Sequence, residues 1–297
     1  FCNSGAEANE TAIKFIRKYA KSKGIKKHNI ITLENSFHGR TIATLKATAQ
    51  EDKHKYFAPY PDGFVYANDI NEAINMIDDT TVGVMLELIQ GEGGIFMQDI
   101  FQVQRLERIL KEKKLLLIID EVQTGVYRSG NFLISQYFGI KPDIITLAKG
   151  LASGIPIGVM MTSLKDIFTF GDHGSTFGGN PLCTKTAVEV LNILEEKYKA
   201  KKIQNTICIF QKELEKILKK NKKLFSSKTG VGLMLGLKLK EERKLQVLIE
   251  TCLKNQVLVL KSGKNIIRFL PPIVISKKEI KEGFKRFEEI LINYHKI

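Results

Sequence analysis

The sequence predicts an α/β protein whose large domain has a mostly parallel central sheet covered by helices, followed by a smaller C-terminal α+β domain. In the first two-thirds of its 297 residues, short apolar runs alternate with amphipathic stretches. The runs at residues 82–89, 115–119 and 144–147 are almost continuously apolar, which is typical of strands buried on both faces of a parallel sheet. Ligands of such sheets bind at the carboxyl ends of the strands, so the polar residues after these runs are candidate site residues.

Apolar residues at helical spacing follow a turn at residues 3–5 and predict the first helix. The pattern then predicts, in order, a strand at 30–33, a loop at 35–40, a strand at 82–89, a helix at 103–110, and strands at 115–119, 144–147 and 157–161. The polar segments at 87–92 and 120–123 and the residue Lys149 lie at strand ends. These ends are expected to meet at one edge of the sheet.

From about residue 182 the pattern changes to long helices and strands that no longer alternate regularly. It predicts, in order, helices at 182–198 and 203–219, a strand at 233–239, a helix at 241–254, strands at 257–260 and 266–270, and a helix at 277–294. This change is typical of an α+β domain. We therefore place a boundary within residues 182–195 and assign residues 1–190 to a large domain and 191–297 to a small one.

Charge and hydropathy disfavour two classes of partner. The formal net charge is +14, but lysine carries nearly all of it, and more than half of these lysines follow Glu195, many of them on predicted helices. Without interleaved aromatic residues and with few arginines, this distribution indicates solvated helix surfaces and no nucleic-acid partner. The longest apolar runs have the length of strands, so no membrane partner is expected.

The four cysteines, Cys2, Cys183, Cys208 and Cys252, are far apart and lack paired spacing. A metal site or a disulfide framework needs clustered ligands or a secreted context, so we expect neither. Buried thiols in a reducing cytoplasm are the plain interpretation, which predicts a cytoplasmic protein. The chain also starts at Phe1 without a methionine, which indicates part of a longer protein.

Two residues at strand ends suggest a carbonyl cofactor. Lys149 follows an apolar strand and precedes small residues. A lysine that is desolvated there can form a Schiff base, although a surface lysine is the commoner explanation of such a residue when it is taken alone. Asp120 ends an apolar run and, if buried, needs a cationic partner such as a protonated pyridine nitrogen. Val122 would share its side of the strand and could contact the ring.

Other interpretations of the same segments stay open. Asp120 could be a strand-end helix cap, or a Mg²⁺ ligand in a nucleotide hydrolase, although no Gly-x-x-x-x-Gly-Lys loop precedes it. Residues 4–6 open the first helix, where backbone amides and the helix dipole favour a phosphate or form an ordinary cap. Residues 173–180 form a Gly-rich loop with two hydroxyls, which suits a phosphate or a plain loop equally well.

Six segments, in the same order along the chain, resemble the class-III aminotransferases, which are pyridoxal-phosphate enzymes of fold type I. They are residues 3–9 (NSGAEAN), 37–41 (FHGRT), 87–94 (ELIQGEGG), 120–125 (DEVQTG), 147–150 (LAKG) and 173–181 (HGSTFGGNP). Each segment is weak alone, but six in order over the whole chain are specific. Within the family, the sequence is most similar to the acetylornithine branch.

The resemblance implies the cofactor and the residues that bind it. The expected cofactor is pyridoxal 5'-phosphate, with Lys149 attached to it covalently and moving the substrate proton, and Asp120 paired with its pyridine nitrogen. The amides of Gly5 and Ala6 are expected to bind the cofactor phosphate. Phe37 is expected to stack on the ring, Val122 to pack against it, and Gln123 to form a hydrogen bond with the ring hydroxyl. The expected assembly is a homodimer, in which Thr176 binds the cofactor phosphate of the partner subunit.

The resemblance also implies the substrates. Arg40, with Ser175 nearby, is expected to bind the substrate α-carboxylate. Arg268 matches the arginine that pairs with Glu92 and is released for a carboxylate of the second substrate; a structural salt bridge is the alternative. The expected reaction moves an amino group from N-acetylornithine to 2-oxoglutarate in arginine biosynthesis. Alternative donors are ornithine, 4-aminobutyrate and succinyl-diaminopimelate, and the non-enzyme alternatives are a pyridoxal-binding regulator and a basic nucleic-acid-binding protein.

Two departures from the family pattern affect these expectations. Ala6 replaces a threonine that is common in the acetylornithine branch, which removes a hydroxyl but leaves the backbone amide. The N-terminal segment of the family is also absent from the sequence. Substrate contacts from that segment are therefore not predicted.

Overall fold

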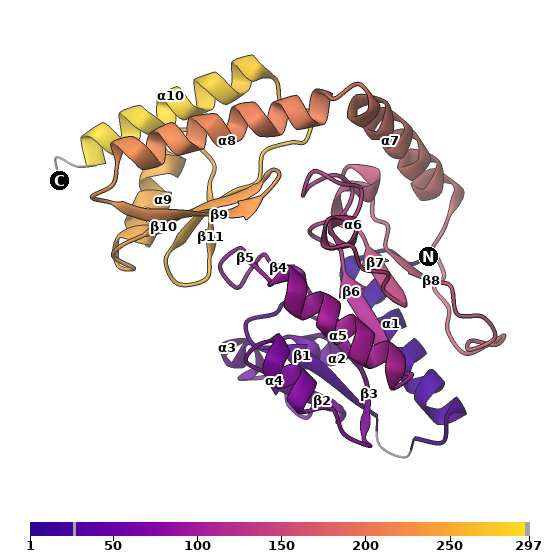
Figure 1. Cartoon of the computed structure of the whole chain (residues 1–297). Coiled ribbons are helices and arrows are strands. Elements are labelled where there is room, and N and C mark those ends of the chain that lie inside the picture. Colours follow the sequence, from indigo (N-terminus) through magenta and orange to yellow (C-terminus); the bar gives the residue numbers. More distant parts are fainter. Residues whose placement is uncertain (26–27, 295–297) are drawn as a thin grey trace. The chain divides into compact units, whose positions relative to one another are not determined.

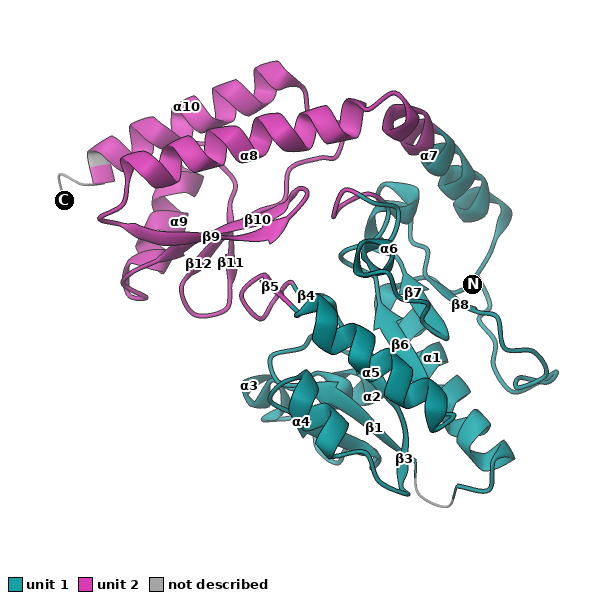
Figure 2. Ribbon diagram, viewed as in Figure 1, with its two compact units in different colours: residues 1–90, 98–126, 131–192 teal, residues 91–97, 127–130, 193–297 magenta. Residues whose placement is uncertain are grey.

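The computed structural model describes residues 1–25 and 28–294, and these form two compact units (Figure 1, Figure 2). Unit 1 comprises residues 1–90, 98–126 and 131–192. Unit 2 comprises residues 91–97, 127–130 and 193–297, so it takes two short segments from the first half of the chain. Within the described residues, we find no helix with the length and apolar character that a membrane span requires.

Unit 1 is built on a six-stranded sheet with strand order β2-β1-β3-β6-β7-β8. Its strands are β1 (Asn29–Leu33), β2 (Phe64–Ala67), β3 (Thr81–Leu86), β6 (Leu116–Asp120), β7 (Ile144–Leu147) and β8 (Val159–Thr162). Neighbouring strands are parallel except for β7 and β8, which are antiparallel. The mostly parallel sheet that the apolar runs predict is therefore confirmed, with one antiparallel strand at its edge.

Several helices of unit 1 pack an apolar face against this sheet. The helices of unit 1 are α1 (Gly5–Ser22), α2 (Ile42–Ala47), α3 (Glu51–His54), α4 (Ile70–Asn75), α5 (Ile100–Glu112), α6 (Ile134–Phe138) and the 3-10 helix η1 (Lys149–Ala152). Ile13 and Ile16 of α1 pack in one core cluster with Met85 of β3 and Ile118 of β6. Helix α4 packs against β1 and β2, and α5 against β6. Strands β3 and β6 are buried along their whole length as a result.

Unit 2 contains a four-stranded antiparallel sheet with strand order β11-β12-β10-β9 and three helices. These elements are α8 (Lys202–Lys220), β9 (Phe225–Val231), β10 (Met234–Leu239), α9 (Lys244–Lys254), β11 (Leu260–Ser262), β12 (Ile266–Phe269) and α10 (Lys277–Tyr294). Apolar residues of all three helices pack on the sheet, among them Leu214, Leu248 and Phe287. The antiparallel sheet with helices confirms the predicted α+β architecture of the C-terminal part.

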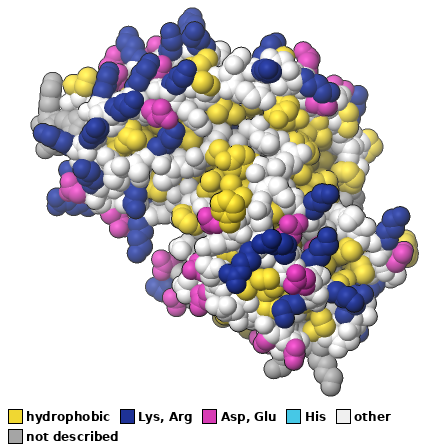
Figure 3. Space-filling model, viewed as in Figure 1, with side chains coloured by type: hydrophobic (Ala, Val, Ile, Leu, Met, Phe, Trp, Pro, Cys, Tyr) yellow, Lys and Arg dark blue, Asp and Glu magenta, His cyan; other side chains and the backbone are white. Residues whose placement is uncertain are grey.

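Three further elements complete the chain. Helix α7 (Pro181–Lys199) contains the point at which the chain passes from unit 1 to unit 2. The short strands β4 (Ile89–Gln90) and β5 (Phe96–Met97) flank the Gly-rich segment 91–94. Figure 3 shows lysine and arginine side chains scattered over the visible face and separated by uncharged and acidic side chains.

Several predicted elements differ from the structure for identifiable reasons. The predicted strand at 82–89 is interrupted at residues 87–88, where the chain bends and Glu87 lines the cavity described below. Only the last residue of the predicted strand at 257–260 belongs to β11, because the segment first closes helix α9: the amide of Val257 donates to Cys252 O, and Gln256 has φ +60°. Strand β9 was missed because it is mostly polar.

The cysteines also differ from expectation in one respect. Cys2, Cys183 and Cys252 are buried, as expected of inert thiols, and burial raises the pKa of Cys252 to about 12. Cys208 is exposed on α8, so the expectation of four buried thiols was wrong for this residue. Its position on an amphipathic helix explains the difference, because the apolar face of α8 is formed by residues such as Phe210 and Leu214.

Candidate active site

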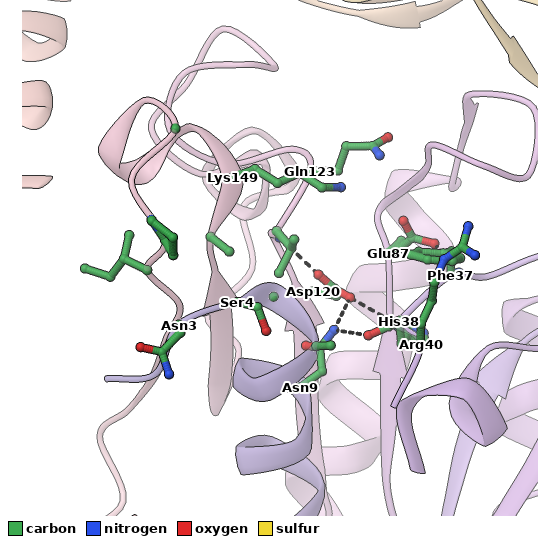
Figure 4. A pocket seen from close by; sticks show the side chains of 18 of the residues that line it. Asn3, Ser4, Asn9, Phe37, His38, Arg40, Glu87, Asp120, Gln123 and Lys149 are labelled. Carbon is green, nitrogen blue, oxygen red and sulfur yellow. Dashed lines mark hydrogen bonds and ion pairs between the residues drawn. The ribbon is translucent and has the colours of Figure 1, made fainter. Parts of the chain in front are cut away.

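A cavity of about 480 Å³ lies in unit 1 at the carboxyl ends of β6 and β7 (Figure 4). The residues with sequence-assigned roles that line it are Gly5, Ala6, Phe37, Arg40, Asp120, Val122, Gln123 and Lys149. The lining residues without an assigned role are Asn3, Ser4, Asn9, His38, Gly39, Glu87, Ala148 and residues 154–157. The strand-end residues Asp120 and Lys149 therefore share one cavity.

Asp120 is the last residue of β6, and its carboxylate is buried at the cavity wall, with 4% of the residue exposed. Its Oδ2 accepts hydrogen bonds from Asn9 Nδ2 at 2.7 Å and from His38 Nδ1 at 2.9 Å. Its Oδ1 accepts one from the backbone amide of Val122 at 3.0 Å. Figure 4 shows the carboxylate between these donors. An ionised carboxylate has about four acceptor positions, so these three donors leave one for a ligand.

Two of these donors were missed by the sequence analysis. Asn9 lies on the buried face of α1 and uses all of its polar atoms: it also donates to His38 O at 2.7 Å and accepts from Thr146 Oγ1 at 2.7 Å. A lone amide between the apolar positions Ala8 and Ala12 is the signal that could have identified it. His38 carries no such signal, because histidines occur at many buried positions without a site.

The amino end of α1 forms one end of the cavity. The side chain of Ser4 caps the helix by accepting from the amide of Glu7 at 3.2 Å. The amides of Gly5 and Ala6 are the first of the helix, so the helix itself offers them no acceptor, and they are suited to an anion. A Cβ on Gly5 would lie 2.6 Å from Val122 Cγ1, so only glycine allows this close approach to the turn after β6.

Phe37 and Arg40 lie together in the loop after β1. The amide of Phe37 donates to Oε2 of the buried Glu87 at 2.8 Å, which fixes the backbone of the loop. The guanidinium of Arg40 lies 5.9 Å from the centroid of the Phe37 ring, and the ammonium of Lys53 lies 5.6 Å from it. Arg40 is exposed. This side of the cavity therefore presents positive charge beside an aromatic face, which suits an anionic substrate.

Lys149 begins the 3-10 helix directly after β7 and has the left-handed φ of +46°. Its side chain reaches the cavity beside Gln123 in Figure 4. The residue is exposed, so this chain by itself does not desolvate Lys149. The reason is local: the residues after it, Gly150 and Ser153, are small and themselves exposed, and cover little surface.

The turn after β6 presents Val122 and Gln123 to the cavity. Strand β6 ends at Asp120, so the expectation that strand alternation places Val122 was wrong, because Val122 lies in a turn. It nevertheless lines the cavity. The Oε1 atom of Gln123 is buried and has no hydrogen-bond partner within the described ranges 1–25 and 28–294.

Ser175 and Thr176 lie outside the cavity lining. Ser175 Oγ accepts hydrogen bonds from Asn3 Nδ2 at 3.0 Å and from the amide of Gly178 at 3.2 Å, so it stabilises its own loop. Thr176 is exposed. This chain therefore does not bring either hydroxyl to the cavity that holds Lys149 and Asp120.

Glu92 and Arg268 form an ion pair within unit 2. Arg268 NH1 donates to Glu92 Oε1 at 2.8 Å and to Gly91 O at 2.9 Å. The side chain of Arg268 is 8% exposed and that of Glu92 is 32% exposed. The Nε of Arg268 is buried without a partner among the residues that the structure describes. A cation with an unused donor and a partly exposed partner can exchange that partner for another carboxylate.

The residues that line the cavity fit pyridoxal phosphate. Asp120 has one acceptor position left for a protonated ring nitrogen, and the unpartnered Gln123 Oε1 can accept from a ring hydroxyl. The helix end at Gly5 suits the phosphate, and Lys149 supplies an amine. Among the described residues there is no group of three or more acidic, histidine or cysteine side chains that could hold a metal ion.

Comparisons with known proteins agree with this fit. Residues 1–291 match the family described as aminotransferase class-III. The acetylornithine aminotransferase of Wolinella succinogenes is 53% identical over 293 residues, which cover 98% of this chain and 75% of that protein. An N-acetylornithine aminotransferase structure from Stenotrophomonas maltophilia has a TM-score of 0.82 at 31% identity and covers 99% of this chain and 74% of the other. An ornithine aminotransferase from Toxoplasma gondii, with pyridoxal phosphate at partial occupancy in its active site, has a TM-score of 0.91 at 28% identity over 99% of this chain and 72% of the other.

Proposed function

This chain belongs to the class-III aminotransferase family, and from that premise we propose that it transfers the amino group of N-acetylornithine to 2-oxoglutarate with pyridoxal 5'-phosphate. The observation that carries the proposal is the cavity of unit 1, which gathers an amine, a buried carboxylate and a helix amino end. The identity of 53% with an acetylornithine aminotransferase supports the choice of amine donor.

The lining residues with assigned roles each have a task in this reaction. When bound, pyridoxal phosphate withdraws electrons from the carbon that bears the reacting amine, so that this carbon can lose a proton. Asp120 holds a negative charge beside the ring nitrogen, and Gln123 orients the ring through its hydroxyl. Lys149 would hold the cofactor covalently, and its Nζ, once displaced from the cofactor by the substrate amine, would take the substrate proton from one carbon and return it to another. Gly5 and Ala6 hold the phosphate, while Phe37 and Val122 contact the ring.

The substrate carboxylates are assigned to two arginines. Arg40 is accessible beside the Phe37 ring, which supports binding of a carboxylate that both substrates carry. Arg268 is held by Glu92, and we assign it to the second carboxylate of 2-oxoglutarate. Ser175 is assigned to substrate binding because it precedes Thr176 in the same loop.

The active enzyme is proposed to be a homodimer in which Thr176 binds the cofactor phosphate of the partner subunit. Thr176 is exposed, and so are three large apolar residues close to it. Their exposed fractions are 71% for Phe177, 70% for Leu182 and 69% for Phe1. Phe1 packs beside Gly179 of the same loop. Exposed apolar side chains of this kind are expected to be covered by another protein surface, and a second copy would cover them here.

The remaining assignments follow from the same reaction. Residues 1–190 are proposed to act as the large cofactor-binding domain and residues 191–297 as the small domain, which the passage between units at residues 192–193 supports. A role in arginine biosynthesis follows from the proposed donor. A cytoplasmic location is supported by the free thiols of the described residues.

A substrate panel tests the proposal. N-acetylornithine, ornithine, 4-aminobutyrate and N-succinyl-diaminopimelate are each incubated with enzyme, pyridoxal phosphate and 2-oxoglutarate, and glutamate formation is measured. We expect kcat/KM to be highest for N-acetylornithine. A preference for 4-aminobutyrate would contradict the proposed donor, and absence of glutamate with all four would contradict the proposed reaction.

A further inference from the structure

The carboxylate of Asp120 is held by a hydrogen-bond network that extends beyond the cavity. Oδ2 has both of its acceptor positions filled, by Asn9 and His38, while Oδ1 has one filled by Val122. The unused acceptor position is therefore on Oδ1. The direction in which it points is set by the donors that hold the other three positions.

Asn9 can act as a donor in this network only in one orientation of its amide. Its Nδ2 lies 2.7 Å from two acceptors, His38 O and Asp120 Oδ2. The reversed amide would place an oxygen against both of them. In the observed orientation, Asn9 Oδ1 faces Thr146 Oγ1, which donates to it at 2.7 Å. All three polar contacts of Asn9 are consistent with one another, and all are buried.

The register of the sheet places Thr146 where this contact is made. Thr146 of β7 is the parallel partner of Asp120 of β6, and its carbonyl accepts from the amide of Glu121 at 3.0 Å. Thr146 is 0% exposed and lies outside the cavity lining, so its hydroxyl reaches Asp120 only through Asn9. Without the hydroxyl, Asn9 Oδ1 would be a buried acceptor with no donor, and the amide would lose its fixed orientation.

His38 holds the other side of the same oxygen. Its ring is completely buried, and because an ionised carboxylate only accepts hydrogen bonds, the contact with Asp120 places a proton on Nδ1. The other ring nitrogen, Nε2, has no hydrogen-bond partner in the part of the chain that the structure describes. The His38 ring therefore makes its hydrogen bond through Nδ1, and Asp120 accepts it.

We propose that Thr146 is a positioning residue that, through Asn9, fixes the direction in which Asp120 presents its free acceptor position to the ring nitrogen of the cofactor. This inference rests on the proposed use of pyridoxal phosphate. Asn9 and His38 act in the same way from closer positions. Because β7 also leads directly into Lys149, one strand would position both the covalent attachment of the cofactor and its ring nitrogen.

The experiment compares Thr146→Val with two controls. Thr146→Ser retains a hydroxyl at the same position. Thr32→Val makes the same substitution in β1 at a threonine that is also 0% exposed, but whose hydroxyl has no hydrogen-bond partner among the described residues. The dissociation constant of pyridoxal phosphate is measured by fluorescence during reconstitution of each apo-protein, and kcat and KM are measured on each reconstituted enzyme with N-acetylornithine.

Loss of one buried hydrogen bond costs about 0.5–1.5 kcal/mol, so Thr146→Val should weaken cofactor binding by roughly two- to twelvefold. We expect a similar fall in kcat with an unchanged KM, since Thr146 does not touch the substrate. Thr146→Ser and Thr32→Val should stay within about twofold of the wild type. Equal losses in Thr146→Val and Thr32→Val, or no loss in Thr146→Val, would overturn the inference.

A second variant keeps the inference testable if Thr146→Val does not fold. Asn9→Asp retains the shape and the bond from Thr146 but puts a second carboxylate against Asp120 in place of a donor. A hydrogen bond to a charged group is worth about 1.5–3 kcal/mol, so cofactor binding should weaken by roughly 10- to 150-fold. Folded Asn9→Asp protein that binds the cofactor like the wild type would overturn the inference. Wild-type protein that does not bind pyridoxal phosphate would instead contradict the proposed function.

Discussion

Replacing Glu92 with glutamine tests whether its ion pair with Arg268 adapts the enzyme to two substrates of different charge. N-acetylornithine carries one carboxylate, whereas 2-oxoglutarate carries two. Arg268 NH1 donates to Glu92 Oε1 at 2.8 Å and to Gly91 O at 2.9 Å. Glu92→Gln keeps the size of the side chain and the bond to Gly91, but removes the negative charge that holds the guanidinium.

The magnitude follows from the contact that is lost. A hydrogen bond to a charged group is worth about 1.5–3 kcal/mol, which corresponds to roughly 10- to 150-fold. The side chain of Glu92 is 32% exposed, so solvent screens the pair and the lower end applies, about tenfold. The substitution should leave the cation of Arg268 unpaired when the substrate has one carboxylate, and have little effect when the substrate supplies a second one.

Single-turnover kinetics on each half-reaction measures this difference. We expect Glu92→Gln to slow the N-acetylornithine half by about tenfold and to leave the 2-oxoglutarate half within about twofold. Arg268→Ala should mainly slow the 2-oxoglutarate half. Glu215→Gln is the matched control, because Glu215 also forms an ion pair in unit 2, with Lys228 at 2.6 Å. If Glu92→Gln and Arg268→Ala slow both halves equally, the pair is only a structural salt bridge and the reasoning is refuted.

Three further predictions concern the cofactor, the assembly and the pH dependence of stability. Borohydride reduction should fix the cofactor to a single peptide that contains Lys149, and recovery of the label on another lysine would refute its assignment. Heterodimers of Lys149→Ala and Thr176→Ala subunits should regain part of the activity, because one of their two sites carries neither change; verified heterodimers without activity would argue against a shared site. Burial lowers the pKa of His173, so its protonation should cost stability as pH falls below about 6.5. His173→Gln should flatten the fall in Tm between about pH 7 and pH 5.5, and an unchanged profile would contradict this.

The sequence was informative wherever one physical requirement dominated a segment. The apolar runs that became β3 and β6 had to be buried on both faces, so the parallel sheet could be predicted from them. Asp120 could be identified because a carboxylate at the end of such a run needs a partner. By contrast, β9 alternates weakly and contains Ser226, Ser227 and Lys228, and its pairing depends on β10, which lies later in the chain.

The residues around Asp120 show why the rest of the candidate site could not be predicted. Thr146 is the single polar residue in the run at 144–147, which suggests a partner but does not identify Asn9 as that partner. Their contact joins residues 137 positions apart and depends on the register of β6 with β7. The exposure of Lys149 was equally unpredictable, because it depends on which surfaces cover the cavity and not on the strand that precedes it.

The path of the chain through unit 2 has a consequence for how the protein can be divided. Residues 91–97 and 127–130 belong to unit 2, although the chain returns to unit 1 after each of them and passes to unit 2 for good only at residue 193. Arg128 NH1 donates to Leu233 O at 3.1 Å and to Pro271 O at 2.6 Å, and Ser262 Oγ donates to Gly91 O at 2.6 Å. A fragment that starts at residue 193 would lack these partners, and cleavage between residues 192 and 193 would therefore divide unit 2 between two fragments. Unit 2 should therefore reach its native state only when both parts of the polypeptide are present, because each part supplies residues that the other cannot replace.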